Sequence, residues 1–345
     1  MLLKDFSQKH GGAWAQLLQA QELTKGFEEK IVQSLPKERM YSSDADMVVF
    51  GSIAREECTN KSDVDWTLLI DGQANPGHLR IAQIIEKALE AVDLTKPGTT
   101  GMFGQITFSH DLIHYVGGED DSNHNLSRRI LLLLESRRIS TDRSQGGTAY
   151  DRVISGIVEQ YIENDSGFIT GRTNDRVPRF LLNDIVRFWR TMCVDFAYKQ
   201  REQQGRKWAL RNIKLRMARR LIFIKGLLLC FKSYQSGWDA NQVKEELIKN
   251  VPIPPLEFIL SVLQERGIPD RLIVQLLDAY NRYLEMLNNE SFRKHLEDIE
   301  MTKAYGDDRF EEARTVSHQF QDALRSIFFE VPGDIREFTL KYGFF

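Results

Sequence analysis

The pattern of apolar and polar positions changes character near Gly117-Gly118. Before that point, apolar residues recur both at helical spacing and in alternation, which predicts a mixture of helices and strands. The predicted helices are 5–33, a short one after Gly51-Ser52, and 79–92, and the predicted strands are 46–50, 65–70 and 105–116. A loop rich in glycine and threonine over 98–104 precedes the last strand. The order strand, helix, strand, helix, strand is typical of an α/β module.

After Gly117-Gly118 the periodicity is almost entirely helical. The predicted helices are 126–139, 150–163, 180–203, 207–231, 239–249, 255–265, 269–287 and 307–329, with breaks at glycine- or proline-containing segments. We therefore predict an α+β protein with two domains. An α/β domain covers residues 1–146 and a helical domain covers residues 147–345, with the boundary near Gly146-Gly147.

Composition and charge exclude several classes of protein. The chain has 345 residues, which suits two domains, and 42% hydrophobic with 28% charged residues is typical of a packed core rather than of disorder. A net charge of −3 does not predict a nucleic-acid coat or a membrane-surface binder. The three cysteines, Cys58, Cys193 and Cys230, do not have the spacing of zinc ligands. The N-terminus lacks the apolar core of a secretory signal. The apolar run 221–231 is too short to cross a bilayer. We expect a cytoplasmic protein with no membrane partner.

The first two predicted strands frame a candidate site for phosphate and metal. Gly51-Ser52 ends the first strand, where glycine lets the backbone approach an anion, Ser52 offers a hydroxyl, and a helix N-terminus offers N–H groups. Asp63 and Asp65, at i and i+2 at the head of the second strand, should leave the same face, while Val64 and Leu68 point into the core. Two such carboxylates predict a site for Mg²⁺ or Mn²⁺. The alternative is that Ser62 and Asp63 only cap a turn.

The same residues resemble a known family. Gly51-Ser52, Ala54-Arg55, Glu57 and Ser62-Asp63-Val64-Asp65 together resemble the Gly-Ser-x-Ala-Arg-x-Glu…Ser-Asp-x-Asp pattern of the nucleotidyltransferase superfamily of the DNA polymerase β type. The resemblance is closest to the signal-transduction and uridylyltransferase-like branch. It implies a polymerase-β-like catalytic domain followed by a helical domain that binds substrate or nucleotide. It also implies transfer of a nucleoside monophosphate from an NTP, with ATP or UTP favoured, to a protein, RNA or small-molecule acceptor with two divalent metal ions.

Within this resemblance, Arg55 and Glu57 shape the loop, and Arg55 is also expected to reach phosphate. Residues 117–121 and 127–137 more faintly resemble the leucine-, glutamate- and arginine-containing helix that follows the catalytic sheet in the same branch. Glu135 and Arg138 are predicted to pair at i, i+3 on that helix. The simpler interpretation is a structural helix packed on the sheet.

A third carboxylate usually lies on a later strand in this superfamily. The polar face of the predicted strand 105–116 shows Gln105, Thr107, Ser109 and Asp111, and Asp111 is the best-placed acid although it lies late in the strand. Asp93, Asp120 and Asp121 are weaker candidates. The predicted catalytic set is therefore Asp63, Asp65 and Asp111. We interpret His110 and His114 as half-buried polar residues.

Residues 199–225 contain ten Lys or Arg residues and only one acid, Glu202. On a helical wheel, the stripe predicted to be core is Leu210, Ile213, Met217, Leu221 and Ile224. One flank of that stripe carries Lys207, Arg211, Lys214 and Lys225, and Arg216, Arg219 and Arg220 lie further round. We predict that Lys207, Arg211 and Lys214 face the active site and hold the triphosphate or an anionic acceptor, joined by Arg187 and Arg190. The alternative is a solvated basic face with ion pairs to acids such as Asp184 and Asp195.

Three functions fit these patterns. The first is an active nucleotidyltransferase, with Gly51, Ser52, Arg55 and the basic residues around Arg211 binding the nucleotide. The second is a synthase of nucleotide second messengers, which would need two nucleotides in one site. The third is a catalytically incomplete NTP-binding sensor or regulatory module, which a missing central third acid favours and the intact Asp63 and Asp65 pair disfavours. Fold alone does not decide between them.

Overall fold

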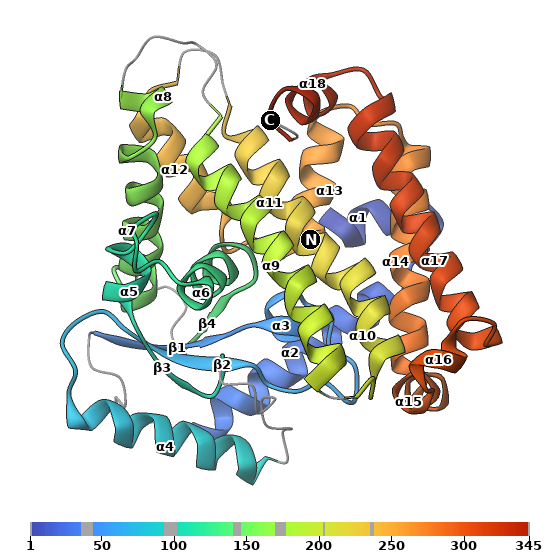
Figure 1. The fold of residues 1–345 in the computed structure, drawn as a ribbon, viewed down its shortest axis with the longest axis horizontal. Helices are drawn as coiled ribbons and strands as arrows, with labels where there is room; N and C mark the ends of the chain where they lie inside the picture. The colour runs from blue at the N-terminus through green and yellow to red at the C-terminus, as the bar shows by residue number, and fades with distance from the viewer. Residues whose placement is uncertain are drawn as a thin grey trace. The chain divides into compact units, whose positions relative to one another are not determined.

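The computed structural model describes residues 2–35, 44–92, 102–140, 146–169, 177–202, 204–234 and 238–343. The fold is α+β, mostly helical with a small mixed sheet, as predicted (Figure 1). Contacts divide the chain into two compact units. We call Gln21–Asp184 with Ser233–Pro254 the sheet unit, and Met1–Ala20 with Ile185–Lys232 and Pro255–Phe345 the helical unit.

In the sheet unit, the described residues form four strands in the order β3-β2-β1-β4. The strands are β1 (Ala45–Val49), β2 (Trp66–Ile70), β3 (Gln105–Phe108) and β4 (Arg137–Ile139). The strand β1 pairs antiparallel with β2 and β4, whereas β2 pairs parallel with β3. The predicted strands at 46–50 and 65–70 are confirmed as β1 and β2. The short strand β4 replaces the end of the helix predicted over 126–139.

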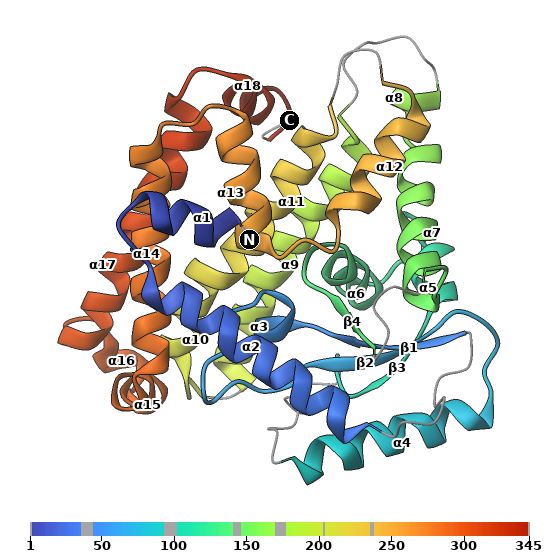
Figure 2. The ribbon, with the colours of Figure 1, turned by 180° about the vertical axis from the view of Figure 1, so that it is seen from behind.

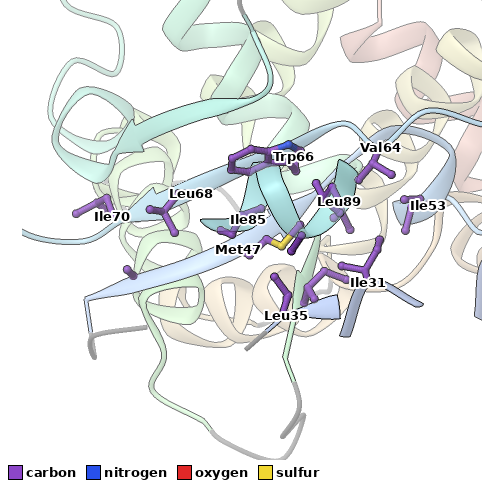
Figure 3. Packing of buried hydrophobic residues seen from close by; sticks show 14 of the residues in the cluster. Ile31, Leu35, Met47, Ile53, Val64, Trp66, Leu68, Ile70, Ile85 and Leu89 are labelled. Atoms are coloured by element: carbon purple, nitrogen blue, oxygen red, sulfur yellow. The ribbon is translucent and has the colours of Figure 1, made fainter. Parts of the chain in front are cut away.

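One face of the sheet packs against α2 (Ala15–Ser34) and α4 (Pro76–Ala91). The two helices lie along the sheet in Figure 2, and the side chains of Trp66, Leu68 and Ile70 alternate onto this face of β2 and meet Ile31 and Ile85 from them (Figure 3). Asn75 caps α4 through Gly77, and Pro76 occupies its first turn, where a missing N–H costs nothing. The predicted core positions Val64 and Leu68 are confirmed, since both belong to this cluster.

The opposite face of the sheet is covered by α6 (Asn123–Leu134) and α7 (Ala149–Glu163) (Figure 1). The helix α7 contacts both β1 and β2, and the Tyr150 N–H donates to the buried Asp46 carboxylate at 2.8 Å. Because α7 packs on the sheet in this way, the compact unit continues past residue 146. The observed units therefore differ from the predicted division into 1–146 and 147–345. The sheet unit also contains α8 (Ser166–Ile169) and α12 (Ala240–Asn250).

The strand predicted over 105–116 was too long. The strand β3 ends at Phe108, and residues Ser109–Ile113 form the short helix α5. Leu112 is fully buried on α5, which packs against α6 and α7. The apolar positions after Phe108 therefore serve a helix turn, and Asp111 lies on α5 instead of on the polar face of a strand.

The helical unit contains most of the predicted C-terminal helices. Its elements are α1 (Leu2–Lys9), most of α9 (Arg179–Glu202), α10 (Trp208–Lys214), the π-helical turn η1 (Leu215–Arg219), α11 (Arg220–Lys232), α13 (Pro255–Glu265), α14 (Asp270–Asn288), α15 (Glu290–Asp298), α16 (Met301–Ala304), α17 (Asp308–Arg325), η2 (Ser326–Glu330) and α18 (Asp334–Tyr342). The predicted core stripe from Leu210 to Ile224 is confirmed, since all five residues are buried. No helix in the described ranges is both long and apolar enough to cross a membrane.

Candidate active site

Gly51 and Asp65 lie in close contact at the end of β1. The Phe50 N–H donates to the Asp65 carbonyl at 2.8 Å, which fixes the chain leaving β1 against the chain entering β2. Gly51 then adopts a left-handed φ of +66°, and a Cβ at this position would lie 2.8 Å from Asp65 Oδ2. Glycine is therefore required both by the backbone angle and by the carboxylate beside it. The glycine and the second aspartate of the motif, distant in sequence, belong to one site.

The two aspartates flank Val64 immediately before β2. The Val64 side chain is buried in the core, whereas Asp63 is exposed and Asp65 is half-buried. This alternation turns both carboxylates away from the core, as predicted for positions i and i+2. Within the described ranges, no three His, Cys, Asp or Glu side chains cluster closely enough to hold a metal by themselves. A pair of carboxylates nevertheless fits Mg²⁺, which takes one or two from protein and completes its shell with water and substrate phosphates.

Arg55 connects the motif to the end of α6. Its Nε donates to Glu57 at 2.8 Å, and its Nη1 donates to Glu135. The other Glu135 oxygen accepts from the Gly51 N–H at 3.3 Å. The exposed fractions of the three side chains are 10%, 4% and 1% for Arg55, Glu57 and Glu135. Arg55 thus shapes the loop, as predicted, by bridging two buried carboxylates.

The part played by Glu135 was not predicted. The sequence suggested a helical pair between Glu135 and Arg138, but α6 ends at Leu134 and residues 137–139 are β4. The two residues therefore do not share a helix, and Arg138 Nη1 lies 3.8 Å from Asp46 instead. The resemblance of residues 127–137 to the family's helix was the only signal in the sequence that Glu135 belongs with the motif.

A second group of contacts holds the outside of the same loop. Glu56 has a left-handed φ of +59°, and its carboxylate accepts from Arg137 at 2.7 Å and from Gln21 Nε2 at 3.2 Å. The Cys58 N–H donates to Thr24 Oγ1 at 3.2 Å, and burial raises the pKa of the Cys58 thiol. The loop between Gly51 and Asp63 is thus anchored to α2 and β4.

A pocket lies on the face of the sheet that carries Thr67 and Thr107. It is lined by Phe50, Thr67, Met102, Phe103, Thr107, Arg128, Leu131 and Leu132. Thr67 follows Asp65 by two residues, so the pocket begins roughly 6–7 Å along the strand from it. Its one cationic lining residue is Arg128, whose buried Nε has no hydrogen-bond partner among the described residues. Burial lowers the pKa of Arg128, and the charge of Asp111 acts in the opposite direction.

The predicted third carboxylate is not at the centre of the neighbouring strand. Thr67 Oγ1 donates to the Gln105 carbonyl at 2.6 Å and lies 2.8 Å from Thr107 Oγ1, so two threonines fill the sheet face beside Asp65. Asp111 lies on α5, with its side chain about half exposed. Of the weaker candidates, Asp121 is buried in an ion pair with Arg129, Asp120 is exposed, and Asp93 lies outside the described residues.

The predicted phosphate-binding residues Lys207, Arg211 and Lys214 belong to the helical unit, at or within α10. Lys207 precedes α10 with a left-handed φ of +55°, and its Nζ lies 3.7 Å from a Glu297 carboxylate oxygen. Arg211 and Lys214 are half-buried. Lys225 was assigned to the same basic flank but is buried, because α11 is enclosed along almost its whole length. Contact of the three residues with phosphate stays a prediction.

Comparison with known proteins points to the same segment. The family model described as "Nucleotidyltransferase domain" matches residues 29–97, which include Gly51-Ser52 and both Asp63 and Asp65. This match supports the nucleotidyltransferase superfamily and, with it, a transferase that uses an NTP. No curated protein sequence matches the chain.

Proposed function

We propose that this protein is a metal-dependent nucleotidyltransferase that transfers a nucleoside monophosphate from an NTP to an acceptor. The observation that carries the proposal is the approach of Gly51 to the Asp65 carboxylate. The space that a Cβ would fill there lies directly beside a carboxylate suited to a divalent cation. A phosphate placed against Gly51-Ser52 would therefore lie next to the metal ligands, as nucleotidyl transfer requires.

In this proposal Asp63 and Asp65 hold Mg²⁺ or Mn²⁺. The bound ion would supply neutralising charge at the transferring phosphate. Gly51 allows the phosphate to approach the backbone, and the Ser52 hydroxyl donates to a phosphate oxygen. The acceptor oxygen forms a bond to the α-phosphorus, the bond from that phosphorus to the β-phosphate oxygen breaks, and pyrophosphate leaves. Arg55 and Glu57 are positioning residues, since their side chains are engaged with each other and with Glu135.

Arg128 is the residue that sequence reasoning missed. Arg128 lines the pocket that begins at Phe50 and Thr67, and its buried Nε has no described partner. Such a donor is costly to bury unless a ligand accepts from it. We therefore assign Arg128 to an anionic group of the nucleotide or acceptor, and Asp111 to balancing the charge of Arg128. Lys207, Arg211 and Lys214 are proposed as further phosphate ligands.

The nucleotide is proposed to be ATP or UTP, and the acceptor a protein, an RNA or a small molecule. A cytoplasmic setting fits cysteines that have neither zinc-ligand spacing nor a disulfide pattern. The test is incubation with each α-³²P-labelled NTP and Mg²⁺ or Mn²⁺, with and without cell extract. Asp65→Asn removes a proposed metal ligand, whereas Asp71→Asn removes a carboxylate at the other end of β2 that pairs with exposed Arg152.

We expect label on an acceptor with the unmodified protein and with Asp71→Asn. With Asp65→Asn we expect transfer to fall about 100-fold or more, because the ion contributes several kcal/mol to the reaction. Equal transfer by Asp65→Asn and the unmodified protein would exclude this site as the catalytic centre.

One observation favours a second candidate, an NTP-binding sensor. Gln105 and Thr107 occupy the β3 face where the family usually places its third carboxylate. Binding of Mn²⁺ and NTP that depends on Asp65, without transfer to any acceptor, would support the sensor. Label found only in a small product made from NTP alone would instead indicate a second-messenger synthase.

A further inference from the structure

Among the described residues, a group of arginines in the helical unit has no carboxylate partner. Arg216 lies in the π-helical turn η1, Arg220 begins α11, and Arg190 lies on α9. Arg216 and Arg220 are four residues apart and therefore share a helix face. Both reach the same stretch of α17: Arg216 Nη1 lies 3.3 Å from His318 Nε2, and Arg220 Nη1 donates to Gln321 at 3.1 Å. The two guanidinium groups thus reach neighbouring positions of the same helix, and neither of these contacts is with a carboxylate.

Arg190 completes the cluster through Cys193, which lies one helical turn from it on α9. The charges of Arg190 and Arg220 both act on the Cys193 thiol, whose pKa is nevertheless raised by burial. Burial, and after it the charge of Arg216, lowers the pKa of Arg220. Arg216 and Arg220 therefore repel each other at a partly buried position, and the exposed Arg190 adds its charge near Cys193.

Several arginines elsewhere on the same unit are ion-paired, whereas Arg309 and Arg336 donate to backbone carbonyls. Arg266 pairs with Asp334, Arg282 with Glu285 and Glu312, Arg293 with Glu297, and Arg314 with Glu311. By contrast, in the described part of the chain no carboxylate lies within 4.0 Å of Arg190, Arg216 or Arg220. The π-helical turn that carries Arg216 adds a second observation, since π-turns inside α-helices occur frequently at functional sites.

We propose that Arg190, Arg216 and Arg220 bind an oligophosphate group, such as the phosphate chain of a nucleotide. The guanidinium group matches the geometry of phosphate oxygens and stays charged when partly buried. Several negative charges on a small ligand match three clustered cations. A single-stranded nucleic acid fits less well, because it needs aromatic faces for stacking, and Trp189 beside Arg190 stacks on Phe223 with ring centroids 5.3 Å apart. The site does not depend on the proposed transferase activity.

The test is isothermal titration of the full chain with tripolyphosphate in a buffer containing EDTA, which suppresses binding through a metal. We expect binding by the unmodified protein and at least about tenfold weaker binding by Arg216→Gln/Arg220→Gln. Arg271→Gln/Lys294→Gln removes the same charge from exposed positions of the same unit and should bind as the unmodified protein does. Asp63→Asn/Asp65→Asn should also bind normally, which separates this site from the proposed catalytic one.

Folding of the variants is followed by thermal melting. Removing mutually repelling charges should leave the melting temperature of Arg216→Gln/Arg220→Gln unchanged or raised. Should that variant melt early, Arg190→Gln, at an exposed position, carries the test and should weaken binding severalfold. Unchanged affinity in Arg190→Gln and Arg216→Gln/Arg220→Gln, or loss of binding in Asp63→Asn/Asp65→Asn, would overturn the proposal. Arginine-dependent binding of a single-stranded RNA without binding of tripolyphosphate would also overturn it.

Discussion

The bridge from Arg55 to two buried glutamates gives a quantitative prediction about the stability of the sheet unit. Arg55→Met keeps the length and much of the apolar stem of the side chain but removes the guanidinium. Glu57 and Glu135 are then left facing the same space without the cation that they share. The Gly51 N–H also loses its fixed acceptor if Glu135 moves.

The expected cost follows from the burial of the three side chains, which are between 1% and 10% exposed. Removing one partner of a buried ion pair typically destabilises a protein by about 3–5 kcal/mol, because the remaining charge loses its compensation. For a domain of roughly 150–250 residues, each kcal/mol lowers the melting temperature by about 2–4 °C. We therefore expect the transition of the sheet unit to fall by about 6–20 °C.

The assay combines thermal melting with hydrogen exchange of β1 and β2, which reports on this unit directly. Arg80→Met is the matched control, because Arg80 is exposed on α4 and such surface changes usually stay within about 0.5 kcal/mol. A second variant neutralises the whole bridge, with Arg55→Met combined with Glu57→Gln and Glu135→Gln. It should recover a substantial part of the lost stability, since no unpaired charge remains buried.

Two results would refute this reasoning. One is a free energy of unfolding for Arg55→Met within about 1 kcal/mol of that for Arg80→Met, which would place the pair in the class of weak surface pairs. The other is a neutralised bridge no more stable than Arg55→Met alone, which would mean that lost packing, not charge, is responsible.

Three further predictions concern the same unit. Gly51→Ala should lower the free energy of unfolding by about 1–2 kcal/mol, because alanine is strained in the left-handed conformation, and should reduce transfer at least about tenfold, because the added Cβ displaces the Asp65 carboxylate. The control is Gly147→Ala, which has a φ of +70° and no described atom within 4 Å of the added Cβ, and it should show only the loss of stability. Arg129→Met should lower the free energy of unfolding in urea by about 3–5 kcal/mol, since its fully buried guanidinium binds two aspartates and a tyrosine, and a loss below about 1 kcal/mol would contradict this. Burial raises the pKa of Asp46 in the folded protein above its value in the unfolded chain, so the stability that Asp46 contributes is fully present below the unfolded-state pKa and is lost as the pH rises through the folded-state pKa. In urea titrations, the stability of Asp46→Asn relative to the unmodified protein should therefore increase with pH. A difference that stays constant with pH would disprove this prediction.

The parts of the fold predicted correctly are those whose signal is local. The strands β1 and β2 are short apolar runs bounded by polar or glycine residues, and the buried stripe from Leu210 to Ile224 repeats at helical spacing. The motif spacing also predicted that Gly51 and Asp65 belong to one site, and the two residues do lie in contact, whereas their roles in binding phosphate and metal stay a proposal. In each case, neighbouring positions in the sequence were sufficient.

The features that were missed depend on residues far apart in sequence. The strand β4 forms because residues 137–139 pair with β1, although the sequence before them has the apolar pattern of a helix that ends at Leu134. Glu135 meets Arg55 across 80 positions, and no helical or strand period relates the two. The end of β3 was misplaced because the alternation after Phe108 also fits a short helix, and only packing of Leu112 against α6 and α7 decides between them.

The most direct test of the central claim is to run the transfer reaction in parallel with NTP labelled at the α-phosphate and at the γ-phosphate. Nucleotidyl transfer at Asp63 and Asp65 predicts label on the acceptor only from the α-labelled NTP, with pyrophosphate released in equal amount and both lost in Asp65→Asn. Acceptor labelling from the γ-phosphate would show phosphoryl transfer and contradict the proposed reaction.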